Sequence, residues 1–252
     1  MSDDGVAELV ADLAAEQETI VSLLRNIGPD DWFRPTPAWG WDVRDTVAHL
    51  AHTDELAVDT CTDGPRALSK LAARCASAGD LTYLGVLEGR RLAGSAVLDW
   101  WERARVAEHA TLLGLDPETR VPWGLGMRPP SFVTARLMET WAHGLDVHAA
   151  LDVEPTDTDR LRHVAWIGLR ALPYAYSVVG LTPPDTPLRV EVTLPSGGTW
   201  ATGPNDAADR ITGPAGQLCR VLVQRLPASA ATDLVAEGDA ARLALRVARS
   251  FL

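Results

Sequence analysis

The chain has 252 residues, of which 46% are hydrophobic and 23% charged, so it resembles an average globular protein large enough for one or two domains. Its formal net charge of −11 disfavours binding to nucleic acids or to anionic membranes, because both would repel the surface. The acidic N-terminus lacks the features of a signal peptide, and no apolar run approaches the roughly 18 residues of a membrane span, so we expect a cytoplasmic protein.

Apolar residues at helical spacing predict several helices in the N-terminal part of the chain. Val6, Leu9 and Leu13 begin the first of these patterns, and Asp42 is a good N-cap for the second. The predicted helices cover residues 6–27, about 43–59, 81–113 and 131–151. Four helices with some long connections are typical of a four-helix bundle with crossovers.

The character of the sequence changes at residues 152–159, an acidic segment with a proline. Beyond it we predict a helix, a strand followed by a Pro-Ser-Gly-Gly turn and a second short strand, and two further helices. The corresponding ranges are about 158–179, 188–194, 214–226 and 238–251. The predicted fold class is therefore α+β, with a helical bundle over residues 1–152 and a small α+β domain over 153–252.

The fourth helix carries polar residues in a pattern that suits a metal site. At about 100° per residue, Arg136, Glu139, His143 and Asp146 fall on one stripe. Glu139 and His143 are four residues apart, so a carboxylate and an imidazole can reach the same point above the helix. A solvent-facing helix surface would show the same pattern, so both interpretations remain open from this helix alone.

The second helix offers a third ligand. His49 lies on a flank of the predicted apolar face, where a lone histidine is more often a partly buried core residue than a ligand. A bundle that brings the second and fourth helices together would complete a His/Glu/His set, which leaves coordination positions open as in catalytic sites. His52 and Asp45 are competing candidates for the third ligand. Asp146 and Asp45 could instead orient the imidazoles.

Two segments carry a resemblance to a known family. The strings WGWDVRDTVAHLAHTDE and ARLMETWAHGLDVHAAL resemble the N-terminal domain of mycothiol-dependent maleylpyruvate isomerases, part of the DinB-like superfamily. The resemblance covers roughly residues 5–151 and implies a four-helix bundle that binds a divalent metal through His49, Glu139 and His143. Zinc is the expected ion, with nickel, iron or manganese as alternatives. From about residue 185 the chain resembles the C-terminal domain of an actinobacterial branch, which is similar to a wyosine base formation module.

The resemblance also implies a co-substrate and a reaction class. We expect mycothiol as co-substrate and an isomerase or S-transferase that acts on a small unsaturated or electrophilic molecule. Arg136 is our candidate catalytic residue, because a guanidinium binds a carboxylate with two donors and this one shares the ligand stripe. An ordinary ion pair with Glu139 is its alternative. Arg210 and Arg220 are weaker candidates from the second domain.

Tryptophans in the loops are candidates for walls of the pocket. Trp123 is the residue that we assign to cofactor binding, and Trp39 and Trp41 lie in a second loop. Each of the three is also a good packing anchor, because a tryptophan buries a large area. His109, His148 and His163 have no partner at ligand spacing and are expected to be structural.

Two other classes of function remain open. The same metal could drive a thiol-independent hydrolysis or cyclisation, because an open-site metal activates bound water or acts as a Lewis acid. Alternatively, the bundle could be a non-catalytic ligand-binding module. The expected partners are a small-molecule substrate and a thiol, without nucleic acid or membrane, and a homodimer is left open.

Overall fold

The computed structural model describes residues 5–73, 78–124 and 126–250. It divides into two compact units, Met1–Pro155 and Thr156–Leu252, which we describe separately. Among the described residues, no helix is both long enough and apolar enough to cross a membrane.

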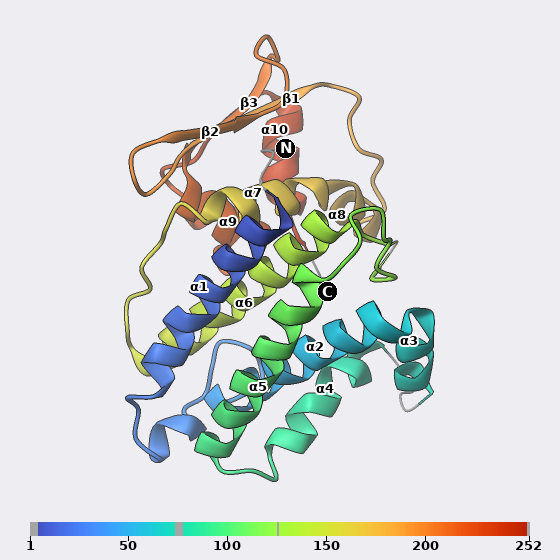
Figure 1. The fold of residues 1–252 in the computed structure, drawn as a ribbon. Coiled ribbons are helices and arrows are strands. Elements are labelled where there is room, and N and C mark those ends of the chain that lie inside the picture. Colours follow the sequence, from blue (N-terminus) through green and yellow to red (C-terminus); the bar gives the residue numbers. More distant parts are fainter. Residues whose placement is uncertain (1–4, 74–77, 125, 251–252) are drawn as a thin grey trace. The chain divides into compact units, whose positions relative to one another are not determined.

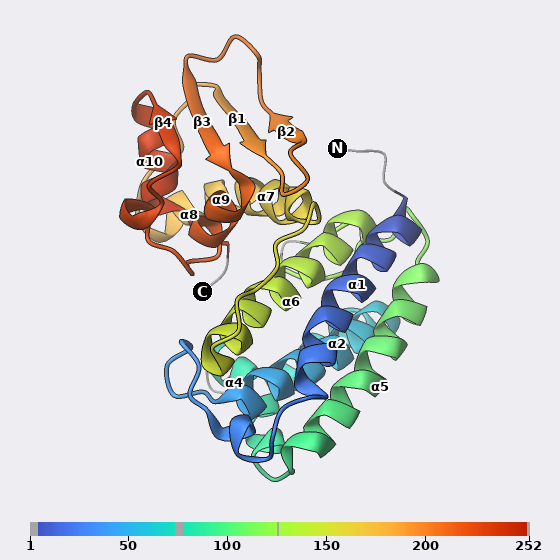
Figure 2. The same cartoon turned by 90° about the vertical axis from the view of Figure 1, so that its left-hand side faces the viewer.

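The first unit is a bundle of long helices (Figures 1 and 2). These are α1 (Val6–Leu24), α2 (Val43–Asp63), α5 (Gly94–Leu113) and α6 (Pro129–Leu151). Helix α2 packs against α5 and α6, and α1 packs against the same two helices. The connections hold η1 (Asp30–Phe33), α3 (Pro65–Ala72) and α4 (Ala78–Gly89). The predicted N-terminal helical bundle is thus confirmed.

The predicted helix over residues 81–113 is wrong in one respect, because it is two helices. Helix α4 ends at Gly89, and α5 begins at Gly94 after a turn closed by the hydrogen bond from Leu92 N to Gly89 O. Gly94 has no room for a side chain, since a Cβ there would lie 2.1 Å from Cγ of Trp32. Apolar spacing continues on both sides of the turn, which is why periodicity alone did not predict the break.

The start of α2 is fixed by reciprocal hydrogen bonds in its first turn. The Asp42 carboxylate accepts from Asp45 N at 2.7 Å, and the Asp45 carboxylate accepts from Asp42 N at 3.3 Å, which is a capping box. Asp45 is almost fully buried and also binds the guanidinium of Arg90, with Nη2 to Oδ2 at 2.6 Å. Because these contacts fix the first turn of α2, they also fix the position of His49 along the helix.

Helix α6 is buried around most of its circumference, unlike a typical surface helix. One reason is Gly144, where a Cβ would lie 2.8 Å from Cδ1 of Ile20 on α1. The absent side chain lets α1 approach closely on that face. Apolar residues such as Leu137 and Val147 occupy other parts of the helix and are fully buried. Polar residues on α6 therefore lie inside the bundle.

The second unit combines a small sheet with short helices (Figure 2). Its strand order is β2-β1-β3-β4, with β1 and β3 parallel and the two outer pairs antiparallel. Helix α9 packs against β1 and β3, and α10 packs against β3 and β4. The elements are α7 (Leu161–Arg170), α8 (Leu172–Val178), β1 (Leu188–Thr193), β2 (Thr199–Thr202), β3 (Asp209–Pro214), α9 (Ala215–Leu222), η2 (Ala228–Ala230), β4 (Val235–Glu237) and α10 (Asp239–Val247). The α+β class is confirmed.

Two details of the second unit differ from the prediction. The helix expected over 158–179 is α7 and α8, and the second of these begins beside Pro173, which cannot donate the backbone hydrogen bond that a continuous helix needs. Strands β3 and β4 were not predicted. Strand β3 begins with Asp209 and Arg210 and ends with Gly213 and Pro214, so its sequence lacks a clear run of β-formers.

Candidate metal centre

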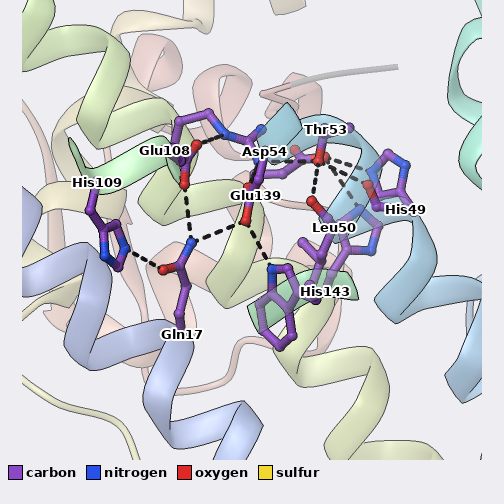
Figure 3. Close-up of polar contacts among 11 residues, drawn as sticks. Gln17, His49, Leu50, Thr53, Asp54, Glu108, His109, Glu139 and His143 are labelled. Carbon is purple, nitrogen blue, oxygen red and sulfur yellow. Dashed lines mark hydrogen bonds and ion pairs between the residues drawn. The ribbon is translucent and has the colours of Figure 1, made fainter. Parts of the chain in front are cut away.

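His49, Glu139 and His143 come together inside the bundle. His49 Nε2 lies 2.8 Å from Oε1 of Glu139, and His143 Nε2 lies 3.6 Å from the same oxygen. Each of the three side chains offers one ligand atom, and these atoms all lie within 4.8 Å of one another (Figure 3). Two imidazoles and a carboxylate in this arrangement could hold a divalent metal ion.

The polar stripe of α6 is buried, so the solvent-facing interpretation is wrong. Arg136 is 3% exposed, His143 8% and Asp146 1%. His49 on α2 is 4% exposed. Placing four polar side chains in a core is costly unless they are paired or bind a ligand. Their burial therefore favours a dedicated site.

Asp146 supports the ring of His143. Its Oδ2 lies 3.2 Å from Nδ1 of His143, at ion-pair distance, while Nε2 of the same ring faces Glu139. A carboxylate behind a ligating imidazole is a common second partner in metal sites. Nδ1 of His49 and Nδ1 of His143 are both buried, and neither forms a hydrogen bond of good geometry among the described residues.

The two competing ligand candidates on α2 do not belong to this group. Asp45 binds Arg90 and caps its own helix, so its carboxylate is already occupied. His52 lies beneath α4, where a Cβ on Gly85 would come within 2.5 Å of its Cβ. The three-residue group that could hold a metal contains neither residue.

The electrostatics of the group differ from one side chain to the next. Burial lowers the pKa of His49, which favours its neutral form. Burial alone would raise the pKa of Glu139, but hydrogen bonds with His143 and His49 outweigh it and hold that pKa well below the usual value. For His143, burial lowers the pKa, yet the Asp146 and Glu139 carboxylates raise it overall to about 9.

Trp41 forms one wall of the centre. Its ring centroid lies 5.1 Å from that of His49 and 6.0 Å from that of His143, nearly parallel to the second. A tight turn holds it in place, with Trp41 N donating to Ala38 O at 3.0 Å and Gly40 at a φ of 79° that favours glycine. Trp39 at the tip of this turn is 97% exposed, so its packing role was predicted wrongly.

Arg136 is held by acidic partners that the sequence did not suggest. Its Nε donates to Glu108 at 2.9 Å, and its Nη2 donates to Asp54 at 2.5 Å and to the Thr53 hydroxyl at 3.1 Å. No ion pair joins Arg136 to Glu139 in the described part of the chain, so the alternative of an i,i+3 pair is wrong. The guanidinium carbon lies 6.0 Å from the ring centroid of the partly buried Trp123.

Sequence reasoning missed the buried polar residues around Arg136, although one signal in the sequence pointed to them. Gln17 interrupts the apolar stripe of α1 between Leu13 and Ile20, and it is fully buried. A polar residue at such a core position predicts a buried polar partner. Its partners are Asp54 and Glu108 on two other helices, which spacing along one helix cannot reveal.

The remaining candidates lie apart from this group. The rings of His109 and His148 are bound to Gln17 Oε1 at 2.6 Å and to Gly144 O at 2.9 Å. His163 is buried in the second unit. Arg220 in that unit pairs with Asp157, and Arg210 donates to backbone carbonyls, including that of Ala207 at 3.2 Å. For these two arginines, a part in the site stays a prediction.

Comparison with known proteins identifies relatives along the whole chain. Two uncharacterised proteins of Mycobacterium tuberculosis, one from strain CDC 1551 / Oshkosh and one from strain ATCC 25618 / H37Rv, are each 38% identical over 252 residues, with 100% of this chain and 97% of the relative covered. Similarity to a wyosine base formation module stays a prediction for the C-terminal unit.

Solved structures support the fold. A crystal structure of the mycothiol-dependent maleylpyruvate isomerase matches with a TM-score of 0.60 at 13% identity, and a histidine-to-alanine mutant of that enzyme matches with 0.59 at 12%. In each case 92% of both chains is covered, and at this identity the likeness shows the fold alone. A family model described as the mycothiol maleylpyruvate isomerase N-terminal domain matches residues 13–148. The chain belongs to this mycothiol maleylpyruvate isomerase family.

Proposed function

We propose that the protein is a metal-dependent enzyme that uses a low-molecular-weight thiol, mycothiol, as an isomerase or S-transferase on a small unsaturated electrophile. The observation that carries the proposal is the buried His49, Glu139 and His143 group, whose ligand atoms lie within 4.8 Å of one another. Membership of a family named for a mycothiol-dependent isomerase supports the choice of thiol and reaction class.

The residues of the centre suit a divalent ion. His49, Glu139 and His143 would hold it, and zinc fits two nitrogens and one carboxylate best, with nickel, iron or manganese as alternatives. Three protein ligands leave a position open for another molecule. When bound, such an ion would act as a Lewis acid and keep a coordinated thiol in its thiolate form at neutral pH.

The surrounding side chains prepare the three ligands for this task. Without a metal, His143 is protonated on both ring nitrogens at neutral pH, because its pKa is raised to about 9, so a bound ion would displace the proton on Nε2. The Asp146 carboxylate, 3.2 Å from Nδ1, would then lie behind the ligating ring. The lowered pKa values of Glu139 and His49 keep the first ionised and the second neutral, the forms that bind metals. Trp41 covers the two imidazoles on one side and excludes water there.

Arg136 and Trp123 would recognise the organic molecules. Nε and Nη2 of Arg136 are occupied, whereas none of the hydrogen bonds between described residues uses Nη1. We assign this nitrogen to a substrate carboxylate, whose negative charge would match the guanidinium. Trp123, which lies against the same guanidinium, would form the neighbouring wall for the thiol.

Thiol dependence is tested with metal-loaded protein and maleylpyruvate, the substrate named for the related isomerase. Mycothiol should support isomerisation, whereas buffer alone and glutathione at the same concentration should give little or none. The matched variant Arg136→Lys keeps the charge and loses the planar donors, so it should raise KM more than it lowers kcat. Equal rates with and without thiol would contradict the proposal and favour thiol-independent hydrolysis or cyclisation.

A further inference from the structure

A buried polar cluster lies where α1, α2, α5 and α6 meet (Figure 3). It consists of Gln17, Asp54, Glu108 and Arg136, one from each helix, and we call it the arginine clamp. Gln17, Asp54 and Glu108 are fully buried, and Arg136 is 3% exposed. Charges that are buried in this way are costly unless they are balanced by partners within the cluster.

Hydrogen bonds join all four members of the arginine clamp. The Gln17 amide nitrogen donates to Asp54 Oδ2 at 3.3 Å and to Glu108 Oε2 at 3.1 Å, so it bridges the two carboxyl groups. The Trp101 indole also donates to Asp54 Oδ2, at 2.9 Å. With the bonds from Arg136, each carboxyl group is held on both oxygens.

The charges in the clamp do not balance if both carboxyl groups are ionised. Arg136 is the one cation that forms an ion pair with Asp54 or Glu108 among the described residues. Two carboxylates and one guanidinium would leave a net negative charge among buried side chains, which is costly. One proton shared by the two carboxyl groups removes this charge.

The neighbouring titratable groups do not supply a second positive charge. Burial lowers the pKa of His109, the partner of Gln17, so this ring is neutral at pH 7. Burial raises the pKa of the Cys61 thiol to about 11, so it is uncharged. Arg105 on α5 pairs with Glu18, and Glu139 on α6 is itself an anion near Arg136. On α1 the contacting side chain is the uncharged Gln17.

The pKa values agree with this charge count. Burial, together with the negative charge of Asp54, raises the pKa of Glu108 from the ordinary 4.5 to about 8. Burial also raises the pKa of Asp54, while hydrogen bonds from Arg136, Trp101 and Glu108 counteract it. Both shifts are in the direction expected if the two carboxyl groups hold one proton at neutral pH.

We propose that Asp54 and Glu108 carry a single proton between them at neutral pH and act as positioning residues, holding Arg136 by Nε and Nη2 and leaving Nη1 for an anionic group of the ligand. The last part, an anionic ligand at Nη1, rests on the proposed function. The shared proton does not, because it follows from the burial and contacts of the clamp.

The shared proton is tested by comparing Asp54→Asn, Glu108→Gln and the double variant with the wild type, using chemical denaturation at pH 6 and pH 8. In the wild type the folded state keeps a proton that the unfolded state loses, so the folding equilibrium constant should fall by on the order of tenfold or more over this range. The raised pKa of His143 also lowers the folding equilibrium constant over this pH range. This contribution is common to all four proteins, so it cancels in the comparison.

In each single variant, the decrease of the folding equilibrium constant that is due to the arginine clamp should disappear. One carboxylate and one guanidinium remain there, and their charges balance without a proton. The double variant leaves Arg136 without an anion, so its melting temperature should drop by about 10 °C more than the sum of the single changes. The shared proton would be overturned if the folding equilibrium constant of both single variants decreased with pH as in the wild type. Additive changes of melting temperature in the double variant would also overturn it.

The positioning role is tested by the affinity of metal-loaded protein for maleate, a small dicarboxylate, between pH 7 and pH 9. Wild-type affinity should weaken by about tenfold as the clamp gains a negative charge, whereas affinity in Glu108→Gln should stay constant. A wild-type profile that matches Glu108→Gln would overturn the positioning role. If maleate binds equally to wild type and Arg136→Lys, the anion subsite of the proposed function fails, while the denaturation experiment still decides on the proton.

Discussion

Asp146 shows how a single side chain can decide the quality of the metal centre. Its carboxylate lies 3.2 Å from Nδ1 of His143 and is 1% exposed, so it is placed to orient the ring of this candidate ligand. The sequence offered Asp146 and Asp45 as carboxylates that could orient the imidazoles, and Asp146 shares the polar stripe of His143. The structure places Asp146 beside a histidine of the group and Asp45 against Arg90.

We expect Asp146→Asn to weaken metal binding by about 10- to 100-fold, because an amide orients the imidazole less firmly and does not raise its basicity. Competition between the protein and a chromophoric chelator measures the affinity. Asp99→Asn on the exposed side of α5 is the control and should bind metal like the wild type. An affinity for Asp146→Asn equal to that of the control would show that Asp146 does not support the centre.

The residues around Arg136 show where sequence reasoning stops. Glu139 and His143 share a helix, so their spacing placed them together. His49 was a candidate from its place on the second helix, and the family resemblance favoured it over His52 and Asp45. Asp54 and Glu108 reach Arg136 from two different helices, 82 and 28 residues away. Such contacts depend on how the helices pack, which no periodicity specifies. Arg136 was therefore predicted as a site residue, but its partners were not.

At the scale of helices, close packing of α4 on α2 depends on glycines that the sequence pattern did not single out. A Cβ on Gly89 would lie 2.3 Å from Cβ of Ala48, the residue before His49. Ala48 is fully buried and its side chain is too short to move aside. The sequence predicted α2 well because an N-cap and an apolar face mark it, whereas apolar spacing continues across the break before α5 and conceals it.

Substituting Gly89 by alanine should lower the free energy of unfolding by about 1–3 kcal/mol, because α4 must shift away from α2. Urea denaturation followed by tryptophan fluorescence measures it. Gly114→Ala, where the nearest atoms would lie at an ordinary 3.6 Å, is the matched control and should be neutral or slightly stabilising. Equal stability of the two variants would argue against close packing at Gly89.

At the scale of the whole molecule, the metal centre lies within the first of two compact units, built by α2 and α6. The α+β class and the N-terminal bundle were predictable from composition, periodicity and motif resemblance. The sheet order of the second unit was not, because β3 lacks a run of β-formers and β4 has three residues. The pairing of β3 with β1 and of β4 with β3 defines these strands.

Metal binding should stabilise the protein by mass action, by about 4 kcal/mol when free metal exceeds the dissociation constant a thousandfold. Differential scanning calorimetry with zinc and with a chelator measures the shift in melting temperature. Glu139→Gln removes the charged ligand and should show no shift. An upward shift of the same size in this variant would place the bound metal elsewhere on the chain.

The most direct test of the metal centre is elemental mass spectrometry of protein purified without an affinity tag. His143→Ala is compared with His148→Ala, which removes another histidine of α6 with the same 8% exposure but with a hydrogen bond to Gly144 O in place of Glu139. We predict about one divalent metal per chain in the wild type and in His148→Ala, and a loss of that metal in His143→Ala. Undiminished metal in His143→Ala, or none in the wild type after reconstitution, would contradict the assignment.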